Sequence, residues 1–497
     1  MRHQLSARQA RWLDADSAHS NANLSLLHIF DPATATGGVV RFKAILAQIE
    51  NRLGSAALFR QRLQAVPLGL DRAYWVDDER FDLEYHVRHI ALPKPGDWRQ
   101  FCIQASRIHA RGLDLERPLW EAYVIEGLDS FLDLPVGSFA LLLKTHRAAV
   151  EGLPLAAIGG LLFDPGAKPP AQAPAAAWMA EPAPSALTLI ACGLAQSLAQ
   201  PSRLARPWAR ALSRAAPTVT ALARELWLRP HTGPVTRFNS VVSPHRVVET
   251  RRFTEAEFDA VRGLVPGATV QHVVLAVCGG ALRHYLNGLG ELPATGSVSV
   301  QVEGDRAGAA AGVAAGVASD AAQPGARGRV FALGTDIADP LERLTSICQQ
   351  AAAAAAQAGS APLAACSLTE LAGPSAPQFL CGARLSYFSA VLPISDGQGL
   401  AFAVSHCDGK LVISLTSCRE LMPDPEVFAQ CLRDSFQTYA ALALALALEL
   451  DLAHKPASVP HLRRACAAPT PAGPAAIKRS RAVASTSGRP SRARRPA

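Results

Sequence analysis

Residues 139–152 read Phe-Ala-Leu-Leu-Leu-Lys-Thr-His-Arg-Ala-Ala-Val-Glu-Gly. The apolar run at the start of this stretch has the length of a buried strand, and it places His146 at the end of that strand. Gly152 and Pro154 then predict a turn into a helix that begins near Leu155. The stretch therefore predicts a strand, a turn and a helix, with polar side chains presented where the strand ends.

The stretch resembles the HHxxxDG motif of the bacterial wax ester synthase/acyl-CoA:diacylglycerol acyltransferase (WS/DGAT) family. The same motif marks the acyltransferases built like chloramphenicol acetyltransferase and the condensation domains of peptide synthesis. Other segments agree with the family in the family's own order: Phe59–Leu63, Trp75–Asp78, Phe81–Val87, Arg117–Glu121, Asn239–His245, Ala268–Ala276, Asp336–Glu342 and Leu400–Leu421. The resemblance thus extends over residues 5–450.

The resemblance implies a mixed α/β fold in which two chloramphenicol-acetyltransferase-like domains enclose a tunnel. A chain of 497 residues also exceeds what one hydrophobic core usually supports. We expect an N-terminal acyltransferase-like domain over 1–165, a Pro/Ala-rich helical crossover linker over 166–234, a C-terminal acyltransferase-like domain over 235–453 and a basic disordered tail over 454–497. Within the C-terminal domain we expect a strand over 297–302, a Gly/Ala-rich loop over 304–328 and a helix over 339–358.

In the family, the second His of the motif is the general base that takes a proton from an acceptor hydroxyl as it attacks an acyl thioester. This chain has Arg147 at that position, and Glu151 replaces the family's Asp. A guanidinium has no accepting lone pair and its pKa exceeds about 12, so Arg147 cannot act as a like-for-like base. Glu151 keeps the charge of an Asp whose family role is a structural ion pair, and Gly152 matches the family.

Two histidines remain as candidate bases. Successive side chains of an extended segment point to opposite faces, so His146 is expected to face away from the position of the family's base. It is either a working base or a buried His hydrogen-bonded beneath the site. Where the family shows Asn-Asp at the start of a helix, this chain has Gln271 and His272, and His272 is either a relocated base or an ordinary exposed helical His.

Of two further family sequence elements, one is matched in this chain and the other is altered. Trp120 and Glu121 match the family's PLWE element, in which we expect a packing residue and a structural partner. The family's Ser-Asn-Val-Pro-Gly-Pro segment corresponds to Glu370–Pro374, where the Gly-Pro turn is kept and the preceding polar pair is not. Polar landmarks are altered while scaffold landmarks persist.

The resemblance implies an acyl-CoA-dependent O-acyltransferase that esterifies diacylglycerol or a fatty alcohol. Such an enzyme uses acyl-CoA as a substrate and needs no cofactor. Whether this chain is catalytically competent is left open, because Arg147 stands where the family has its general base. The alternative is a degenerate paralogue that binds acyl ligands or lipid surfaces, or that partners an active homologue. Acceptor identity, acyl chain length and oligomeric state stay open.

The positive charge of the chain lies at its C-terminal end. The formal net charge is +8, and residues 455–497 contain ten Lys and Arg residues and no acidic residue, which leaves −2 for residues 1–454. Such a tail favours weak attraction to an anionic membrane or lipid-droplet surface; it has no aromatic residue that would indicate specific nucleic-acid binding. Ten cysteines without a CxxC pair, and a polar N-terminus, lead us to expect a cytoplasmic protein that can attach peripherally to the inner face of the membrane or to lipid inclusions.

Overall fold

The computed structural model describes residues 3–128, 130, 134–168, 178–199, 233–304, 329–353, 364–374 and 376–454. Residues Met1–Leu448 form one compact unit, and Glu449–Ala497 form a second unit, of which only the last helical residues are described. The expected Gly/Ala-rich loop falls almost wholly outside the described residues. So do most of the expected linker and all of the tail after His454.

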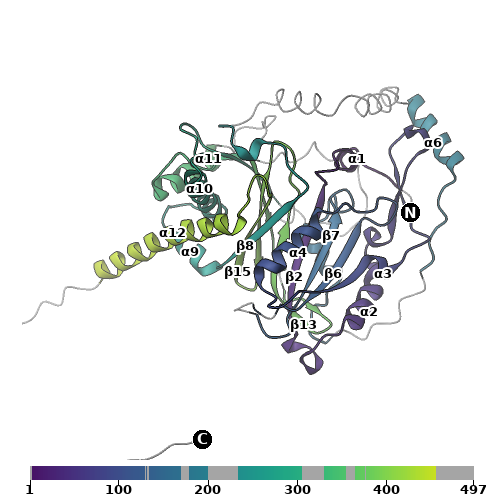
Figure 1. Cartoon of the computed structure of the whole chain (residues 1–497), viewed down its shortest axis with the longest axis horizontal. Coiled ribbons are helices and arrows are strands. Elements are labelled where there is room, and N and C mark those ends of the chain that lie inside the picture. The colour runs from purple at the N-terminus through teal and green to yellow at the C-terminus, as the bar shows by residue number, and fades with distance from the viewer. Residues whose placement is uncertain are drawn as a thin grey trace, which may run out of the picture. The chain divides into compact units, whose positions relative to one another are not determined.

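The first six-stranded sheet has the strand order β12-β13-β2-β7-β6-β5, and β5 and β6 are its parallel pair (Figure 1). Helix α4 packs on one face of this sheet, and α2 and α5 pack on the other. The elements of this part of the chain are α2 (Phe42–Arg52), α4 (Trp98–Ala110), α5 (Leu155–Gly160), β2 (Asn23–Asp31), β5 (Val87–Ala91), β6 (Trp120–Glu126), β7 (Phe139–His146), β12 (Phe379–Leu380) and β13 (Ala383–Val391).

The second six-stranded sheet has the order β10-β9-β11-β14-β15-β8, with β11 parallel to both β9 and β14. Its apolar face is covered by helices that lie together at the left of Figure 1. The elements are β8 (Arg246–Thr254), α9 (Glu255–Arg262), α10 (Val270–Gly288), β9 (Ser299–Gly304), β10 (Arg329–Ala332), α11 (Pro340–Ala353), β11 (Cys366–Leu371), β14 (Leu400–Cys407), β15 (Lys410–Cys418) and α12 (Pro425–His454).

The two sheets meet along β13, β14 and β15. The Ser405 hydroxyl donates to the carbonyl oxygen of Phe388 at 2.7 Å, and the Ser414 hydroxyl donates to that of Ala390 at 2.7 Å. Because β12 and β13 come from the expected C-terminal domain but complete the first sheet, the expected division at residue 235 does not separate the two sheets.

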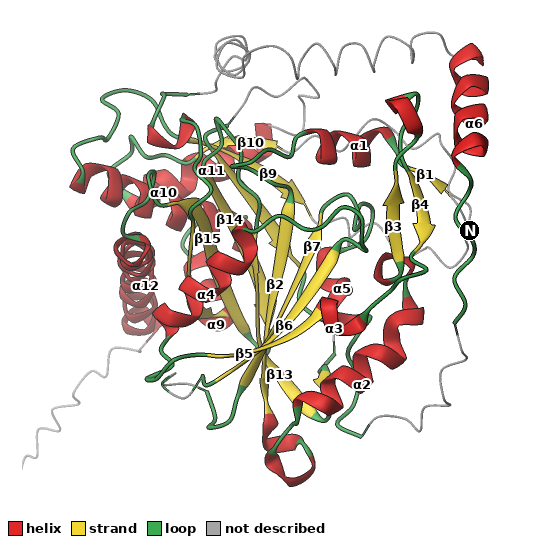
Figure 2. Cartoon of the chain, turned by 45° about the vertical axis from the view of Figure 1, so that its right-hand side comes forward, coloured by secondary structure: helices red, strands yellow, loops and turns green. Residues whose placement is uncertain are grey.

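A smaller three-stranded sheet lies beside the first sheet and has the order β1-β4-β3 (Figure 2). It is formed by β1 (His3–Gln4), β3 (Gln61–Gln64) and β4 (Tyr74–Asp77). The remaining α-helices of the described chain are α1 (Ala7–Asp14), α3 (Leu83–His86) and α6 (Ala186–Ala199). Ser6 is the N-cap of α1, because its side chain accepts a hydrogen bond from the main-chain N–H of Gln9.

Most elements predicted from the sequence are present. The motif strand ends at His146, and Pro154 is the N-cap of α5. The helix expected over 339–358 begins at Pro340 and is described to Ala353. The strand expected over 297–302 runs instead from Ser299 to Gly304, so it is shifted by two residues.

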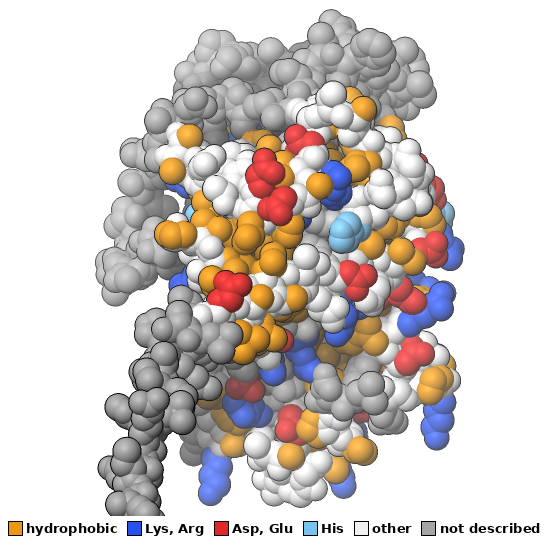
Figure 3. All heavy atoms as spheres, turned by 90° about the vertical axis from the view of Figure 1, so that its left-hand side faces the viewer, with side chains coloured by type: hydrophobic (Ala, Val, Ile, Leu, Met, Phe, Trp, Pro, Cys, Tyr) orange, Lys and Arg blue, Asp and Glu red, His pale blue; other side chains and the backbone are white. Residues whose placement is uncertain are grey.

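Helix α12 carries exposed leucines near its C-terminal end, at positions 444, 446 and 448. No helix among the described residues is both long enough and apolar enough to span a membrane. The side of the molecule at the left of Figure 1 shows apolar side chains gathered between single charged groups (Figure 3).

Candidate active site

Strand β7 carries the motif into the middle of the first sheet. All of its residues are buried, and it pairs with β2 on one side and β6 on the other. After the strand, the main-chain N–H of Arg147 donates to the carbonyl oxygen of Ala22 at 2.9 Å. Gly152 has φ +84°, in the region that favours glycine, and a Cβ there would meet nothing within 4 Å. Glycine is therefore needed here for the conformation of the turn and not for space.

Both ring nitrogens of His146 are engaged. The main-chain N–H of Ala148 donates to Nδ1 at 3.1 Å, and Nε2 lies 3.1 Å from Oδ2 of Asp16. Because Nδ1 accepts, the proton of a neutral ring is on Nε2 and is donated to Asp16. The side chain is only 1% exposed. No ring nitrogen is left with a free lone pair.

Arg147 lies between the two sheets. Its guanidinium forms an ion pair with the carboxylate of Glu303 on β9, and it stacks over the ring of Trp12, 4.4 Å from the ring centroid. The Arg147 side chain is 25% exposed and that of Glu303 is 32% exposed, so solvent reaches both partners. The position of the family's base thus holds a cation that is already paired.

Glu151 contacts the beginning of α1. It accepts a hydrogen bond from the Ser6 hydroxyl at 2.7 Å and lies 3.3 Å from Nε of Arg8. Ser6 caps α1, so Glu151 ties the loop after β7 to that helix. The Glu151 carboxylate therefore has an arginine partner in this chain.

Gln271 lies at the start of α10 and contacts Glu370, the residue that replaces a polar landmark of the family. Its Nε2 donates to Glu370 at 3.0 Å, and the same carboxylate lies 3.6 Å from Nε2 of His406. His406 also contacts Glu255 at 3.0 Å. The hydrogen bond with Glu370 is the main cause of a raised pKa at His406, and the bond from His406 lowers the pKa of Glu370. Two altered landmarks therefore bond to each other.

His272 takes part in the N-terminal cap of α10. Its Nδ1 accepts from the main-chain N–H of Thr269 at 3.3 Å and lies 3.5 Å from the thiol of Cys348 on α11. Partial burial lowers the pKa of His272. The ring is neither fully exposed nor free of partners.

The register of β9 and β11 separates these two groups of residues. Glu303 is aligned with Thr369, and Gly304 is aligned with Glu370. Since neighbouring residues on a strand face opposite sides, Glu303 and Glu370 lie on opposite faces of the sheet. Gln271, which bonds to Glu370, therefore lies on the face of the second sheet that α10 covers. Arg147, which is paired with Glu303, lies on the opposite face. The structure does not bring His146, Arg147, Gln271 and His272 into one cluster.

Trp120 and Glu121 begin β6 and have different surroundings. Trp120 is fully buried, donates from Nε1 to the carbonyl oxygen of Phe59 at 3.0 Å, and stacks on His86 with 4.6 Å between ring centroids. Glu121 accepts from the Tyr123 hydroxyl at 2.9 Å and lies 3.5 Å from Nζ of Lys144. Both residues build the sheet on which the motif strand lies.

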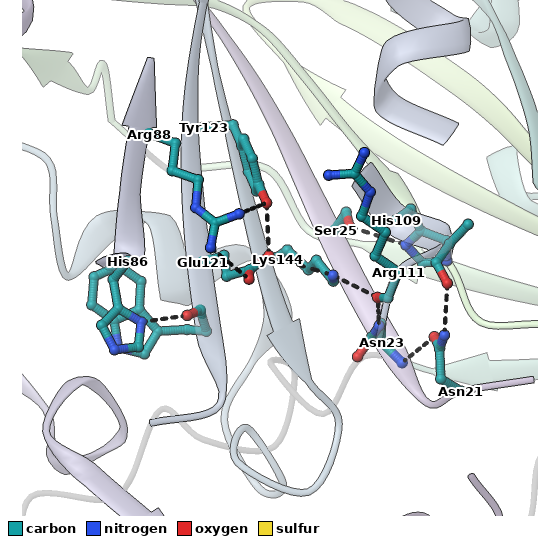
Figure 4. Close-up of polar contacts among 12 residues, drawn as sticks. Asn21, Asn23, Ser25, His86, Arg88, His109, Arg111, Glu121, Tyr123 and Lys144 are labelled. Carbon is teal, nitrogen blue, oxygen red and sulfur yellow. Dashed lines mark hydrogen bonds and ion pairs between the residues drawn. The ribbon is translucent and has the colours of Figure 1, made fainter. Parts of the chain in front are cut away.

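Lys144 belongs to a polar network that sequence reasoning missed (Figure 4). Its Nζ donates to the carbonyl oxygen of Arg111 at 2.6 Å, and Asn23 donates to the same oxygen at 2.8 Å. These side chains satisfy the end of α4, where unpaired carbonyl oxygens favour a cation. Burial lowers the pKa of Lys144 to about 8.

Glu303, Trp12 and Asp16 were also missed as partners of the motif. Of these three, only Glu303 could have been suspected from the sequence, because its carboxylate directly follows the strand expected over 297–302. Among the described residues, no group of three or more His, Cys, Asp and Glu side chains is arranged to hold a metal ion.

Comparison with known families assigns the chain. The family model of the wax ester synthase/diacylglycerol acyltransferase catalytic domain matches residues 5–274, and the WS/DGAT C-terminal domain matches residues 341–439. The chain therefore belongs to the WS/DGAT family, which confirms the resemblance read from the motif.

Relatives and a solved structure agree with this assignment. A putative diacylglycerol O-acyltransferase of Mycobacterium tuberculosis is 28% identical over 448 residues, covering 84% of this chain and 86% of the relative. A second such protein of that organism is 31% identical over 344 residues, covering 67% of each chain. The wax ester synthase/diacylglycerol acyltransferase from Marinobacter aquaeolei VT8 has a TM-score of 0.63 at 21% identity, covering 88% of this chain and 99% of its own. The predicted mixed α/β fold of this class is confirmed.

Proposed function

We propose that this chain transfers a fatty acyl group from acyl-CoA to the hydroxyl of a diacylglycerol or a fatty alcohol, at a rate limited by the absence of a general base at position 147. The observation that carries the proposal is the ion pair of Arg147 with Glu303, at the motif position of a WS/DGAT family member. The acceptor oxygen attacks the thioester carbon, a C–O bond forms, the C–S bond breaks, and the hydroxyl proton ends on the thiol of CoA.

Removing the proton from the acceptor hydroxyl is the difficult step of this reaction. A neutral imidazole takes it near neutral pH, whereas a guanidinium has no lone pair to accept it. The hydrogen bonds of His146 to Ala148 and Asp16 support a structural role for that residue, because its ring has no free acceptor. The location of His272 on the opposite face of the second sheet argues against a relocated base.

Transfer without a base relies on holding both substrates in reacting geometry. Loss of a general base typically lowers the rate by about 10²–10⁴. The hydrogen-bonded scaffold around Trp120 and Glu121 supports a site that still positions its substrates. The proposed reaction needs acyl-CoA as a substrate and no cofactor.

The apolar acceptors place the proposed reaction at a lipid surface. The basic residues of 455–497 support peripheral attachment to an anionic membrane or lipid inclusion on its cytoplasmic side.

Ester formation from radiolabelled acyl-CoA tests the proposal. The purified full-length chain is incubated with diacylglycerol or a long-chain alcohol in detergent, beside the Marinobacter enzyme and a heat-inactivated sample. We expect ester above the inactivated control and about 10²–10⁴ below the Marinobacter enzyme. Binding of acyl-CoA without any ester would contradict the proposal and would favour the alternative of a chain that only binds acyl ligands.

A further inference from the structure

A groove lies between α4, β8 and the segment that joins β15 to α12. Its cavity volume is about 490 Å³, which is within the range of ligand-binding pockets. Its lining residues come from three segments of the chain, 99–111, 244–249 and 419–427. The groove is therefore built from both halves of the chain.

Arginines without an acidic partner surround this groove. Arg107, Arg111 and Arg419 all line it and are exposed, and none of them forms an ion pair with any described residue. By contrast, Arg99, which also lines the groove, is paired with Glu426 at 3.0 Å. Three guanidinium groups thus remain free to bind an anion.

The acidic residues of the lining do not neutralise these three cations. Glu249 is buried, accepts from Nε1 of Trp98 at 2.6 Å and is paired with Arg251 at 3.2 Å. Glu426 is taken by Arg99, and Asp424 is exposed at the beginning of α12. Part of the buried wall between the charges is apolar, at Val248 and Cys102, and the buried polar side chains of Ser106 and Arg246 complete it.

The inner end of the groove contacts the segment that supports the motif. The carbonyl oxygen of Arg111 accepts from Asn23, and Asn23 is the strand partner of His146. In Figure 4 the main chain of Arg111 is bonded, whereas no interaction is drawn to its guanidinium. On the other wall, Arg246 donates to the carbonyl oxygen of His19 at 2.8 Å. A molecule in the groove would lie beside residues 16–23, which also hold His146 and the main chain of Arg147.

We propose that this α4–β8 groove binds the phosphorylated adenosine of acyl-CoA, with Arg107, Arg111 and Arg419 contacting its phosphates. The planar guanidinium matches phosphate oxygens in paired hydrogen bonds, and the apolar patch formed by Val248 and Cys102 suits one face of an adenine ring. This inference rests on the proposed function, and it specifies where the charged end of the acyl donor is held. The thioester arm would then extend past residues 16–23 toward the motif.

Direct binding tests the groove without requiring catalysis. The probe is adenosine 3′,5′-bisphosphate, titrated calorimetrically into the full-length chain and into Arg111→Gln, Arg419→Gln and the double variant. We expect each single substitution to weaken binding about tenfold, as for loss of a hydrogen bond to a charged group, and the double variant to weaken it further. Arg262→Gln is the matched control, because Arg262 is exposed and paired with Asp259 on α9, away from the groove lining; it should leave binding unchanged.

Kinetics with acyl-CoA separate this inference from the proposed function. The same substitutions should raise KM for acyl-CoA and leave kcat nearly unchanged, and the preference for CoA over dephospho-CoA as a competitor should shrink. Nucleotide binding that depends on the arginines, without any ester formation, would support the groove as the nucleotide site and would contradict the proposed acyl transfer. Ester formation with an unchanged KM and unchanged nucleotide binding would overturn the groove.

Vesicles test the other source of phosphate. Full-length chain and the double variant are compared on vesicles with and without phosphatidylglycerol. We expect equal vesicle binding. A loss of binding to the anionic vesicles alone, with nucleotide binding intact, would assign the groove to a lipid headgroup and overturn the proposal.

Discussion

Arg147 and Glu303 form an ion pair that joins the end of β7 in the first sheet to β9 in the second. The motif position that carries a base in the family is thereby turned into a link between the two sheets. Solvent-exposed ion pairs contribute little to stability, typically below about 1 kcal/mol. We therefore expect the pair to contribute little to the stability of the fold. Its main consequence is that position 147 holds a paired guanidinium, which cannot act as a general base.

His146 is predicted to be a buried structural residue that takes no part in the reaction. His146→Ala removes the partner of the Ala148 main-chain N–H and of Oδ2 of Asp16, whose Oδ1 still accepts from Ala22, so the free energy of unfolding should fall by about 1–3 kcal/mol. Ester formed per folded molecule should stay the same. Chemical unfolding and the radiolabel assay measure the two quantities, with His284→Ala on the exposed surface of α10 as control. A stable variant that forms no ester would instead make His146 the base.

Glu151 is predicted to hold the beginning of α1 in place through Ser6 and Arg8. Glu151→Asp shortens the side chain that reaches Ser6 and Arg8, so α1 should be held less firmly and stability should fall by about 0.5–1 kcal/mol. Activity should not increase. Thermal unfolding of this variant beside Glu50→Asp, a substitution at an exposed site on α2, measures the effect. An activity gain from Glu151→Asp alone would show that this side chain, and not Arg147, limits the reaction.

The contacts of His406 predict a pH-dependent contribution to stability. Glu370 and Glu255 raise the pKa of His406 above 6.5, so the stabilisation is fully present below pH 6.5 and is lost as pH rises through the raised pKa. The difference in unfolding free energy between the wild type and His406→Gln should thus be larger at about pH 5.5 than at about pH 8.5. Urea unfolding at both pH values measures it, with His284→Gln as control. A difference that is equal at both pH values would show that His406 is not charged in the folded chain.

The tail after His454 is predicted to attract anionic surfaces. Deleting residues 455–497 removes ten basic residues and no acidic ones, so binding to anionic liposomes should fall, and the difference should shrink above about 0.15 M salt, where screening shortens to about 8 Å. Melting temperature and ester formation in detergent should stay unchanged. Earlier unfolding of the truncated chain, or equal binding to neutral and anionic liposomes, would contradict this role.

Local signals in the sequence predicted the frame of the site. The end of β7 at His146, the turn at Gly152 and the start of α11 at Pro340 all follow from short-range patterns. Gly373, in contrast, has a tertiary cause, because a Cβ there would lie 1.8 Å from the carbonyl oxygen of His406 on β14.

The partners of the motif were beyond such signals because they are distant in the chain. Glu303 is 156 residues from Arg147, and Asp16 is 130 residues from His146. The return of β13 to the first sheet depends likewise on long-range pairing. Only the folded arrangement shows that Arg147 is paired and that Gln271 bonds to Glu370.

Replacing Arg147 tests the central claim most directly. Single-turnover ester formation is measured at saturating acyl-CoA for the wild type, Arg147→His with Glu151→Asp, and Arg147→Lys, all with matched melting temperatures. The account predicts a gain of at least about tenfold for the double variant, because an imidazole can accept the acceptor's proton, and no gain for Arg147→Lys, which keeps a cation. No gain from a well-folded double variant, or an equal gain from Arg147→Lys, would contradict the claim that the missing base at this position limits the reaction.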